Sequence, residues 1–230
     1  MSRILIVEDE NNIGEIVEYN IKMASHQATR VTSAEAALAL LEAGEQFDVA
    51  ILDIMLPGKS GIELCREIRR NDRHTGIIML SAKSQESDKV TCLSAGADDY
   101  ITKPFGVQEL LARVESLLRR VKMDVLPTGE GDILQSGPFT LDLKSRMLYK
   151  NKQIIELTSV EFNIMELFFR NVDTALVREK ILEGVWGKDY YGDVKIVDVN
   201  IRRLRIKIEE DPSNPQHIVT VWGYGYRWTV

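Results

Sequence analysis

The amino-acid sequence predicts an α/β protein with a five-stranded parallel sheet in its first domain, followed by a smaller α+β domain. Within residues 1–121, short apolar runs alternate about five times with segments whose apolar residues have helical spacing. Residues 138–230 instead open with short strands at turn-like intervals and continue with helices. Strand and helix in alternation are typical of a parallel sheet covered on both faces, whose working site lies beyond the carboxyl ends of the strands.

The first domain is expected to place its strands at the apolar runs, with amphipathic helices between them. We expect strands at residues 3–7, 28–31, 49–52, 77–80 and 100–101. We expect helices at residues 13–24, 34–41, 61–70 and 107–120. Residues 122–137 then lose the periodicity and gather Pro127, Gly129, Gly131 and Gly137, a composition typical of a flexible linker.

The second domain is expected to begin with three short strands, FTLDL, RMLYK and QIIEL, in an antiparallel meander. Thr158 stands three residues before Glu161, the spacing of a capping box, so a helix should begin there. Further helices are predicted at residues 178–186 and 194–209. The final segment, IVTVWGYGYRW, has aromatic-rich strands around glycines and predicts a hairpin.

Composition describes a globular chain: 44% of its residues are hydrophobic, 28% are charged and its formal net charge is −6. No uncharged apolar run is long enough to span a membrane, and the N-terminus enters a strand without the pattern of a signal peptide. Cys65 and Cys92 lack the spacing of metal ligands and are expected to be reduced packing residues. We therefore expect a cytoplasmic protein.

Polar side chains follow four of the five predicted strands. Glu8 and Asp9 follow the first, Asp53 the third, Ser81 the fourth and Lys103 the fifth. In a parallel sheet these strand ends share one edge. Clustered carboxylates repel one another unless a cation joins them, and oxygen ligands alone suit Mg²⁺. A carboxylate beside such an ion can attack phosphorus and form an acyl phosphate, so this edge is a candidate phosphoryl-transfer site, although each residue alone could simply be a turn or cap residue.

The segments ILIVEDE, VAILDIMLPGKSGIEL, IIMLSA and GADDYITKPF resemble the flavodoxin-like receiver domain of two-component response regulators. The resemblance implies that Asp53 is phosphorylated by a partner sensor histidine kinase. It implies that Asp9, Asp53 and the backbone carbonyl of Met55 hold Mg²⁺, with Glu8 assisting through a metal-bound water. It also implies that Ser81 is the switch hydroxyl, Tyr100 the switch aromatic and Lys103 the phosphate-binding lysine, followed by a cis bond to Pro104.

The predicted helix over residues 194–209 has a core stripe of Val197, Ile201, Leu204 and Ile208 at helical spacing. Its basic residues fall off this stripe or at its border, and Val199 and Ile206 are expected to point outward. A charged surface helix could look the same. An outward valine nevertheless favours a DNA-reading helix, because apolar side chains can contact thymine methyl groups.

Residues 138–230, with VDVNIRRLRIKIE and VWGYGYRW, resemble the winged-helix output domain of the OmpR/PhoB family. The resemblance implies that the third helix enters the major groove while the hairpin, or wing, contacts the adjacent minor groove or backbone. The implied DNA-facing residues are Lys195, Val199, Asn200, Arg202, Arg203 and Arg205. Asn200 stands where a histidine is common, and Trp222 stands where the wing usually carries arginine. Residues 187–193 are implied as a contact for RNA polymerase.

The receiver resemblance also implies a two-fold homodimer of the active protein, formed through its fourth helix, fifth strand and fifth helix. The implied apolar patch is Val90, Leu93 and Ala112. The implied charge pairs are Lys89 with Glu109, Asp99 with Arg113, and Asp98 with Arg120. Glu115 stands where a lysine is common.

Our interpretation is a DNA-binding transcriptional regulator that is switched by phosphorylation and is not an enzyme, although it would catalyse its own phosphorylation and dephosphorylation. Two alternatives stay open. One is a regulator that binds DNA without phosphorylation. The other is a phosphohydrolase with Asp53 as its nucleophile, a chemistry that usually places a second carboxylate two residues later, where this chain has Met55.

Overall fold

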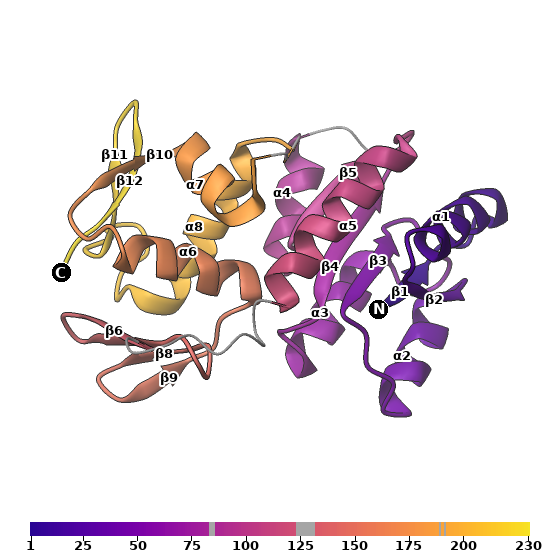
Figure 1. Cartoon of the computed structure of the whole chain (residues 1–230), viewed down its shortest axis with the longest axis horizontal. Coiled ribbons are helices and arrows are strands. Elements are labelled where there is room, and N and C mark those ends of the chain that lie inside the picture. The colour runs from indigo at the N-terminus through magenta and orange to yellow at the C-terminus, as the bar shows by residue number, and fades with distance from the viewer. Residues whose placement is uncertain (83–85, 123–131, 189, 191) are drawn as a thin grey trace. The chain divides into compact units, whose positions relative to one another are not determined.

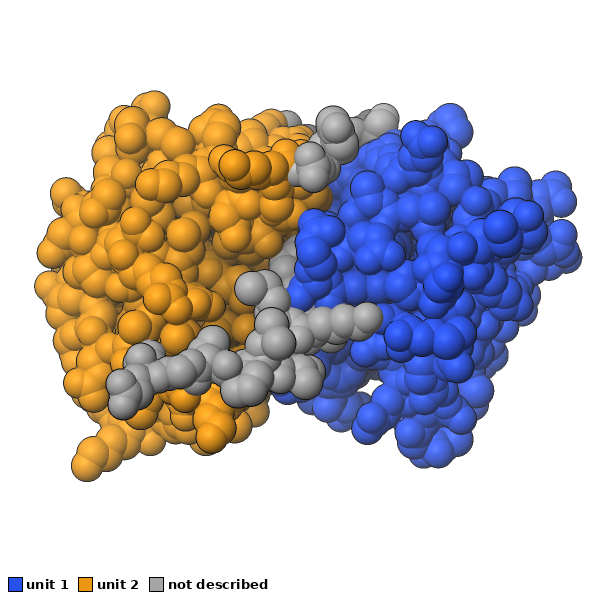
Figure 2. All heavy atoms as spheres, viewed as in Figure 1, with its two compact units in different colours: residues 1–121 blue, residues 122–230 orange. Residues whose placement is uncertain are grey.

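The computed structural model describes residues 1–82, 86–122, 132–188, 190 and 192–230, and for residues 86–89 and 120–122 it describes the backbone alone. The chain divides into two compact units, Met1–Val121 and Lys122–Val230, which Figure 2 colours separately. Among the helices described, none is long and apolar enough to cross a membrane.

Unit 1 is built on a fully parallel five-stranded sheet in the order β2-β1-β3-β4-β5 (Figure 1). The strands are β1 Arg3–Val7, β2 Gln27–Val31, β3 Val49–Asp53, β4 Gly76–Ser81 and β5 Asp99–Thr102. The helices are α1 Asn11–Met23, α2 Ala34–Glu42, α3 Gly61–Asn71, α4 Glu86–Ser94 and α5 Val107–Lys122. The predicted parallel α/β fold is confirmed. Helix α4 is an addition to the predicted elements, because its sequence ESDKVTCLS offers few apolar residues for a helical stripe.

One face of this sheet packs against α1 and α5. Alternate residues of the strands, such as Ile4, Ile6 and Ile51, join Val17 of α1 and Val114 of α5 in one buried cluster. This alternation is the period of two that a strand imposes on its side chains, and it fixes which strand residues are left to face the other helices. The sheet holds the carboxyl ends of β1, β3, β4 and β5 on a common edge.

Unit 2 opens with an antiparallel four-stranded sheet in the order β6-β7-β8-β9. Its strands are β6 Ile133–Ser136, β7 Phe139–Asp142, β8 Met147–Lys150 and β9 Gln153–Ile155. The structure corrects the predicted linker over residues 122–137 at both ends, because α5 runs to Lys122 and residues 133–136 form β6. This strand is only four residues long and lies between glycine and proline residues, so its sequence has no clear periodicity.

The rest of unit 2 contains three helices and a second sheet. The helices are α6 Ser159–Phe169, α7 Arg178–Trp186 and α8 Lys195–Ile208, and the strands β10 Ala175–Val177, β11 Ile218–Val221 and β12 Gly225–Trp228 form a sheet in the order β10-β12-β11. The capping box of Thr158 and Glu161 is present at the start of α6. Phe139, Phe169 and His217 surround the buried ring of Trp228, whose indole N–H donates to Ser136 Oγ at 2.8 Å. The three helices and the β11–β12 hairpin give the winged-helix arrangement that we predicted.

Candidate functional site: an acidic pocket and a basic helix

The ends of β1, β3 and β5 bring Glu8, Asp53 and Lys103 into contact. Lys103 Nζ donates to Glu8 Oε1 at 2.9 Å and to Asp53 Oδ2 at 2.7 Å. Glu8 has no exposed surface and Asp53 is 3% exposed. Residues up to 95 positions apart in sequence thus form one buried ionic cluster at the carboxyl edge of the sheet.

The backbone around Asp53 holds this carboxylate in place. Asp53 Oδ1 accepts a hydrogen bond from the Met55 amide at 3.1 Å, and the Ile54 amide donates to the Leu80 carbonyl at 3.0 Å. The start of α3 approaches closely, since a Cβ atom at Gly61 would lie 1.9 Å from the Asp53 carbonyl oxygen. Only glycine fits there, so the sequence after Asp53 is shaped to close around the end of β3.

The two proposed switch residues lie on the neighbouring strands. Ser81 ends β4, is 3% exposed, and its carbonyl accepts the Lys103 amide at 2.7 Å. Tyr100 is 8% exposed and lies opposite Met79 in the β4–β5 register. The Lys103–Pro104 bond is cis, as the resemblance implied.

Burial and charge set the protonation of the pocket. Burial, with the nearby Asp53 charge, raises the pKa of Glu8 to about 7, although the Lys103 hydrogen bond opposes this shift. Burial alone would lower the pKa of Lys103, but its hydrogen bonds to Asp53 and Glu8 outweigh that effect and raise the pKa. Lys103 therefore stays an ammonium, while Glu8 can take up a proton near neutral pH.

The donor set suits a hard divalent cation. Carboxylate oxygens of Glu8, Glu10 and Asp53 lie within 4.8 Å of one another, and all-oxygen ligands are those that Mg²⁺ prefers. The structure brings Glu10 into this group, whereas Asp9, the ligand that we had inferred, is exposed and outside it. Met55, two residues after Asp53, is also exposed. The carboxylates at the strand ends thus fit the ion, with Glu10 rather than Asp9 as the third acid of the group.

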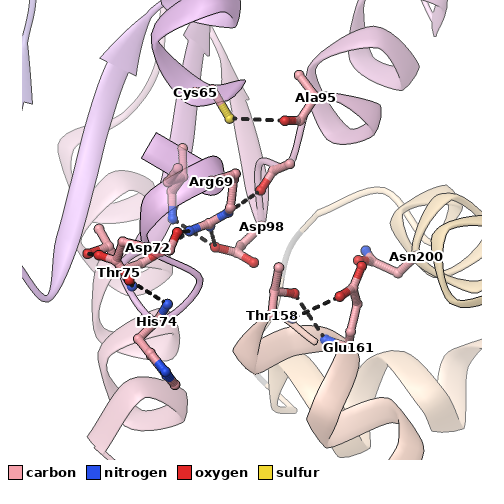
Figure 3. Close-up of polar contacts among 12 residues, drawn as sticks. Cys65, Arg69, Asp72, His74, Thr75, Ala95, Asp98, Thr158, Glu161 and Asn200 are labelled. Atoms are coloured by element: carbon pink, nitrogen blue, oxygen red, sulfur yellow. Dashed lines mark hydrogen bonds and ion pairs between the residues drawn. The ribbon is translucent and has the colours of Figure 1, made fainter. Parts of the chain in front are cut away.

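Several charges expected at a dimer surface are paired within one chain. Asp98 is 2% exposed and accepts from Arg69 Nη2 at 2.5 Å and from the Ile77 amide at 2.8 Å, and Figure 3 shows the Arg69 contact. Arg113 contacts Asp99 at 3.0 Å and Glu109 at 2.6 Å. Asp98, which the resemblance implied in a charge pair with Arg120 of a dimer, is thus engaged by Arg69 and the Ile77 amide within one chain.

The remaining residues of that predicted surface are unevenly exposed. Ala112 is exposed, Val90 is half-buried and Leu93 is only 2% exposed. Glu115 Oε1 shares a hydrogen bond with His26 Nε2 at 2.7 Å. The side chains of Lys89 and Arg120 lie outside the described residues.

Helix α8 presents fewer residues to solvent than we predicted. Lys195 and Arg202 are exposed, and Ile206 is 61% exposed. Val199 is 8% exposed and Asn200 is fully buried, which corrects the outward placement of Val199 and leaves Asn200 no surface for DNA. Because α8 packs on both α6 and α7, its buried face is wider than one core stripe.

Two arginines of α8 are engaged inside unit 2. Arg203 Nε lies 3.2 Å from Glu161 Oε1, and Arg203 Nη1 donates to Asn200 Oδ1 at 3.3 Å. Figure 3 shows Asn200 beside the Thr158–Glu161 capping pair. Arg205 Nε donates to the Ile218 carbonyl at 2.9 Å. These contacts could not be predicted from helical spacing, which does not reveal partners on other elements.

Sequence reasoning also missed a polar cluster between α7, α8 and β12. Asp198 Oδ1 accepts from Arg178 Nε and from the Tyr226 hydroxyl, both at 2.7 Å. Asp198 and Tyr226 are 28 positions apart, and no local pattern links them. In the predicted polymerase-contacting segment 187–193, Asp189 and Tyr191 lie outside the described residues.

Comparison with known proteins agrees with both units. Residues 4–115 match the response regulator receiver domain family, and residues 151–228 match the family described as "Transcriptional regulatory protein, C terminal". The chain is 41% identical over 227 residues to the sensory transduction protein RegX3 of Mycobacterium tuberculosis, and 40% identical to RegX3 of Mycolicibacterium smegmatis, with 99% of each chain covered.

Solved structures give the same assignment. The response regulator DrrB, a Thermotoga maritima OmpR/PhoB homologue, aligns over 100% of both chains with a TM-score of 0.53 and 33% identity. A mutant of RitR aligns over 99% of both chains with a TM-score of 0.77 and 24% identity, which supports the fold alone. The chain therefore belongs to the OmpR/PhoB family of two-component response regulators, and it is a phosphorylation-dependent DNA-binding response regulator.

Proposed function

We propose that Asp53 is the residue that accepts the phosphoryl group, and that a sensor histidine kinase is its donor. The observation that carries this proposal is the contact of Lys103 with both Asp53 and Glu8 in one buried pocket. An oxygen of the Asp53 carboxylate would attack phosphorus, forming a P–O bond as the P–N bond to the kinase histidine breaks. The ammonium of Lys103 would then hold a phosphoryl oxygen in place of a carboxylate.

The proposed metal site uses the acids beside Asp53. Asp9, Asp53 and the Met55 carbonyl would hold Mg²⁺, with Glu8 assisting through water and Glu10 close enough to contribute. When bound, the ion would neutralise the charge that gathers on the transferring phosphoryl group. This environment would also let the domain promote its own phosphorylation from small donors and its own dephosphorylation.

The proposed switch begins with Lys103. When the ammonium of Lys103 binds a phosphoryl oxygen, its contact with Glu8 would weaken. The Ser81 hydroxyl on the adjoining strand would bind another phosphoryl oxygen. Tyr100 of β5, the proposed switch aromatic, would then change its side-chain position in response. Homodimerisation through α4, β5 and α5 would then use Val90 and Ala112 with the charges of Glu109 and Arg113. A two-fold dimer suits this set because the same patch serves both subunits.

The proposed DNA-binding element is α8. Its exposed Lys195 and Arg202 would contact promoter DNA, and a dimer would place two such helices at half-sites about one helical turn apart. RNA polymerase would contact segment 187–193. The buried Val199 and Asn200 are left out of this interface.

The test is phosphotransfer to the full chain from a small acyl phosphate donor with Mg²⁺. Wild-type protein should form an acid-labile adduct, and Asp53→Asn should form none, because an amide is a poor nucleophile. An undiminished adduct on Asp53→Asn would move the site elsewhere. Rapid release of phosphate with no effect on DNA affinity would favour a phosphohydrolase. Equal DNA affinity with and without the adduct would favour a phosphorylation-independent regulator.

A further inference from the structure

The loop that follows Asp53, residues 54–60, contacts a carboxylate from α2. Glu35 Oε1 accepts a hydrogen bond from the Lys59 amide at 3.2 Å. The same oxygen would lie 3.2 Å from a Cβ atom placed on Gly58, so the carboxylate lies against this glycine. Gly58 has φ of +74°, a backbone conformation that glycine adopts without strain. Glu35 thus holds the loop at its bend.

Glu35 is itself fixed at the start of its helix. Helix α2 begins at Ala34, and Ser33 caps it by accepting the Ala36 amide at 3.2 Å. Hydrogen bonds from the amide of Glu35 itself and from the Lys59 amide lower the pKa of the Glu35 carboxyl. The N-terminus of a helix also favours negative charge. The exposed side chain of Glu35 is therefore an ionised acceptor at neutral pH.

The first part of the same loop contacts Asp53. The Met55 amide donates to Asp53 Oδ1 at 3.1 Å, and the Met55 carbonyl is the proposed backbone ligand of Mg²⁺. Between Met55 and Lys59, Leu56 is 8% exposed and Pro57 has a fixed φ angle, so this stretch has little conformational freedom. A displacement of Lys59 should therefore also move Met55.

The ends of the loop are fixed by other contacts. The Gly61 amide donates to the Ile54 carbonyl at 3.1 Å, and Ser60 and Glu63 form a capping box at the start of α3. These contacts act on the first and last residues of the loop. The hydrogen bond to Glu35 acts on the bend between them, where a small shift would alter the geometry around Asp53.

We propose that Glu35 is a positioning residue for phosphoryl transfer, which acts by holding the Lys59 amide and so the place of Met55. The Met55 amide then orients the Asp53 carboxylate. This inference rests on the proposed role of Asp53. Glu35 acts through the backbone of the loop rather than by touching the reacting atoms. Glutamine in place of Glu35 should serve nearly as well, because the hydrogen bond, and not the charge, holds the loop.

The first test is residue-resolved amide hydrogen exchange on the unphosphorylated, metal-free full chain. Glu35→Ala should speed exchange at Lys59 by about fivefold, as expected for the loss of one hydrogen bond, and should also speed exchange at Met55. Glu35→Gln keeps an oxygen acceptor and should exchange like the wild type. Wild-type exchange at Met55 in Glu35→Ala would overturn the inference.

The matched control is Glu67→Ala. Glu67 Oε1 of α3 contacts Lys59 Nζ at 2.7 Å, and both side chains are about equally exposed. This variant therefore removes a carboxylate partner of the same lysine and leaves the contact of the Lys59 amide with Glu35 intact. It should exchange like the wild type at Lys59 and Met55.

The second test measures Mg²⁺ affinity by isothermal titration calorimetry and the rate of adduct formation from a small acyl phosphate donor. Glu35→Ala should lower both by up to about tenfold, the lower end of the loss when a group that supports a metal ligand is removed. Glu35→Gln should recover most of the loss, and Glu67→Ala should match the wild type. Equal losses for Glu35→Ala and Glu35→Gln would indicate an effect of charge through space and would overturn the inference.

The result for Asp53→Asn separates failure of this inference from failure of the proposed function. If Asp53→Asn keeps its adduct, the proposed function fails and the positioning role of Glu35 fails with it. If Asp53→Asn loses its adduct while Glu35→Ala has wild-type affinity and rate, the positioning role alone is wrong.

Discussion

Arg203 of the proposed DNA-reading helix lies 3.2 Å from the fully buried carboxylate of Glu161. Glu161 also caps the start of α6 by accepting the Thr158 amide, and its second oxygen contacts Lys207 at 2.5 Å. Burial alone would raise the pKa of Glu161, but Arg203 and Lys207 outweigh it and hold the pKa below the usual range. One carboxylate thus joins α6 to two turns of α8. The first role of Arg203 is therefore to stabilise the packing of these two helices.

Arg203→Ala should therefore weaken binding to a specific and a scrambled duplex by the same factor. The resemblance implied that Arg203 faces DNA, and a base-reading role for it would require a larger loss on the specific duplex. Removing the arginine leaves a buried oxygen short of a partner, so unfolding free energy should fall by about 1–3 kcal/mol. Anisotropy titrations on the two duplexes decide the matter, with the exposed Arg202→Ala as the control that should leave stability unchanged.

Glu161→Ala should destabilise unit 2 by about 3–5 kcal/mol, because it leaves two cations without their buried partner and removes half of a capping box. Glu161→Gln keeps an acceptor for the Thr158 amide and should cost less. Glu166→Ala is the control, because Glu166 lies on the same helix and its side chain is partly exposed. Urea unfolding followed by the fluorescence of buried Trp186 and Trp228 gives the values. A loss below about 1 kcal/mol for Glu161→Ala would contradict the proposed connection between the helices.

Sequence reasoning reached the parallel sheet because buried strands and amphipathic helices have different periods, and it reached the acidic pocket because strand ends in a parallel sheet converge. It could not identify which acid after β1 lies within reach of Glu8 and Asp53, because Asp9 and Glu10 are neighbours in sequence and both are exposed. It placed Val199 outward because helical spacing shows one packed face, whereas α8 is packed by α6 and α7 together. Partners from distant segments, such as Asp198 with Tyr226, leave no local pattern at all.

Asp9→Ala should weaken Mg²⁺ binding at least about tenfold and slow phosphorylation from a small donor, because losing one direct carboxylate ligand raises the cost of holding the ion. Glu10→Ala should have a smaller effect. Both residues are exposed, so neither variant should unfold the domain. Isothermal titration calorimetry with Mg²⁺ compares the affinities of the two variants for the ion. The reverse order would assign the ion to the group of Glu8, Glu10 and Asp53 that the structure brings together.

Glu8 should make the stability of the metal-free receiver depend on pH. Its pKa is raised from 4.5 to about 7 in the folded chain, chiefly by burial. A raised carboxyl pKa stabilises the fold fully below the unfolded value, and that contribution is lost as pH rises through the folded value. Stability should therefore decline between about pH 4.5 and 7, and Glu8→Gln should flatten the decline. Urea unfolding in a chelating buffer, followed by circular dichroism at several pH values, measures both.

Arg69→Ala should destabilise the receiver through Asp98 rather than weaken a dimer. Arg69 donates to Asp98 and to the carbonyls of Gly96 and Thr75, so its removal leaves a carboxylate that is 2% exposed without its cation. Breaking a buried pair in this way costs about 3–5 kcal/mol. The adjacent, exposed Arg70→Ala is the matched control and should change stability little.

Two measurements separate this internal role of Asp98 from a role between subunits. Urea unfolding of the unphosphorylated full chain should show the loss at protein concentrations where no dimer forms. Sedimentation of the phosphorylated chain should show Asp98→Asn dimerising normally at temperatures where it remains folded, because the Asp98 carboxylate is engaged by Arg69 and the Ile77 amide. A variant of Asp98 with wild-type stability and impaired dimerisation would instead support the pairing with Arg120 that the resemblance implied.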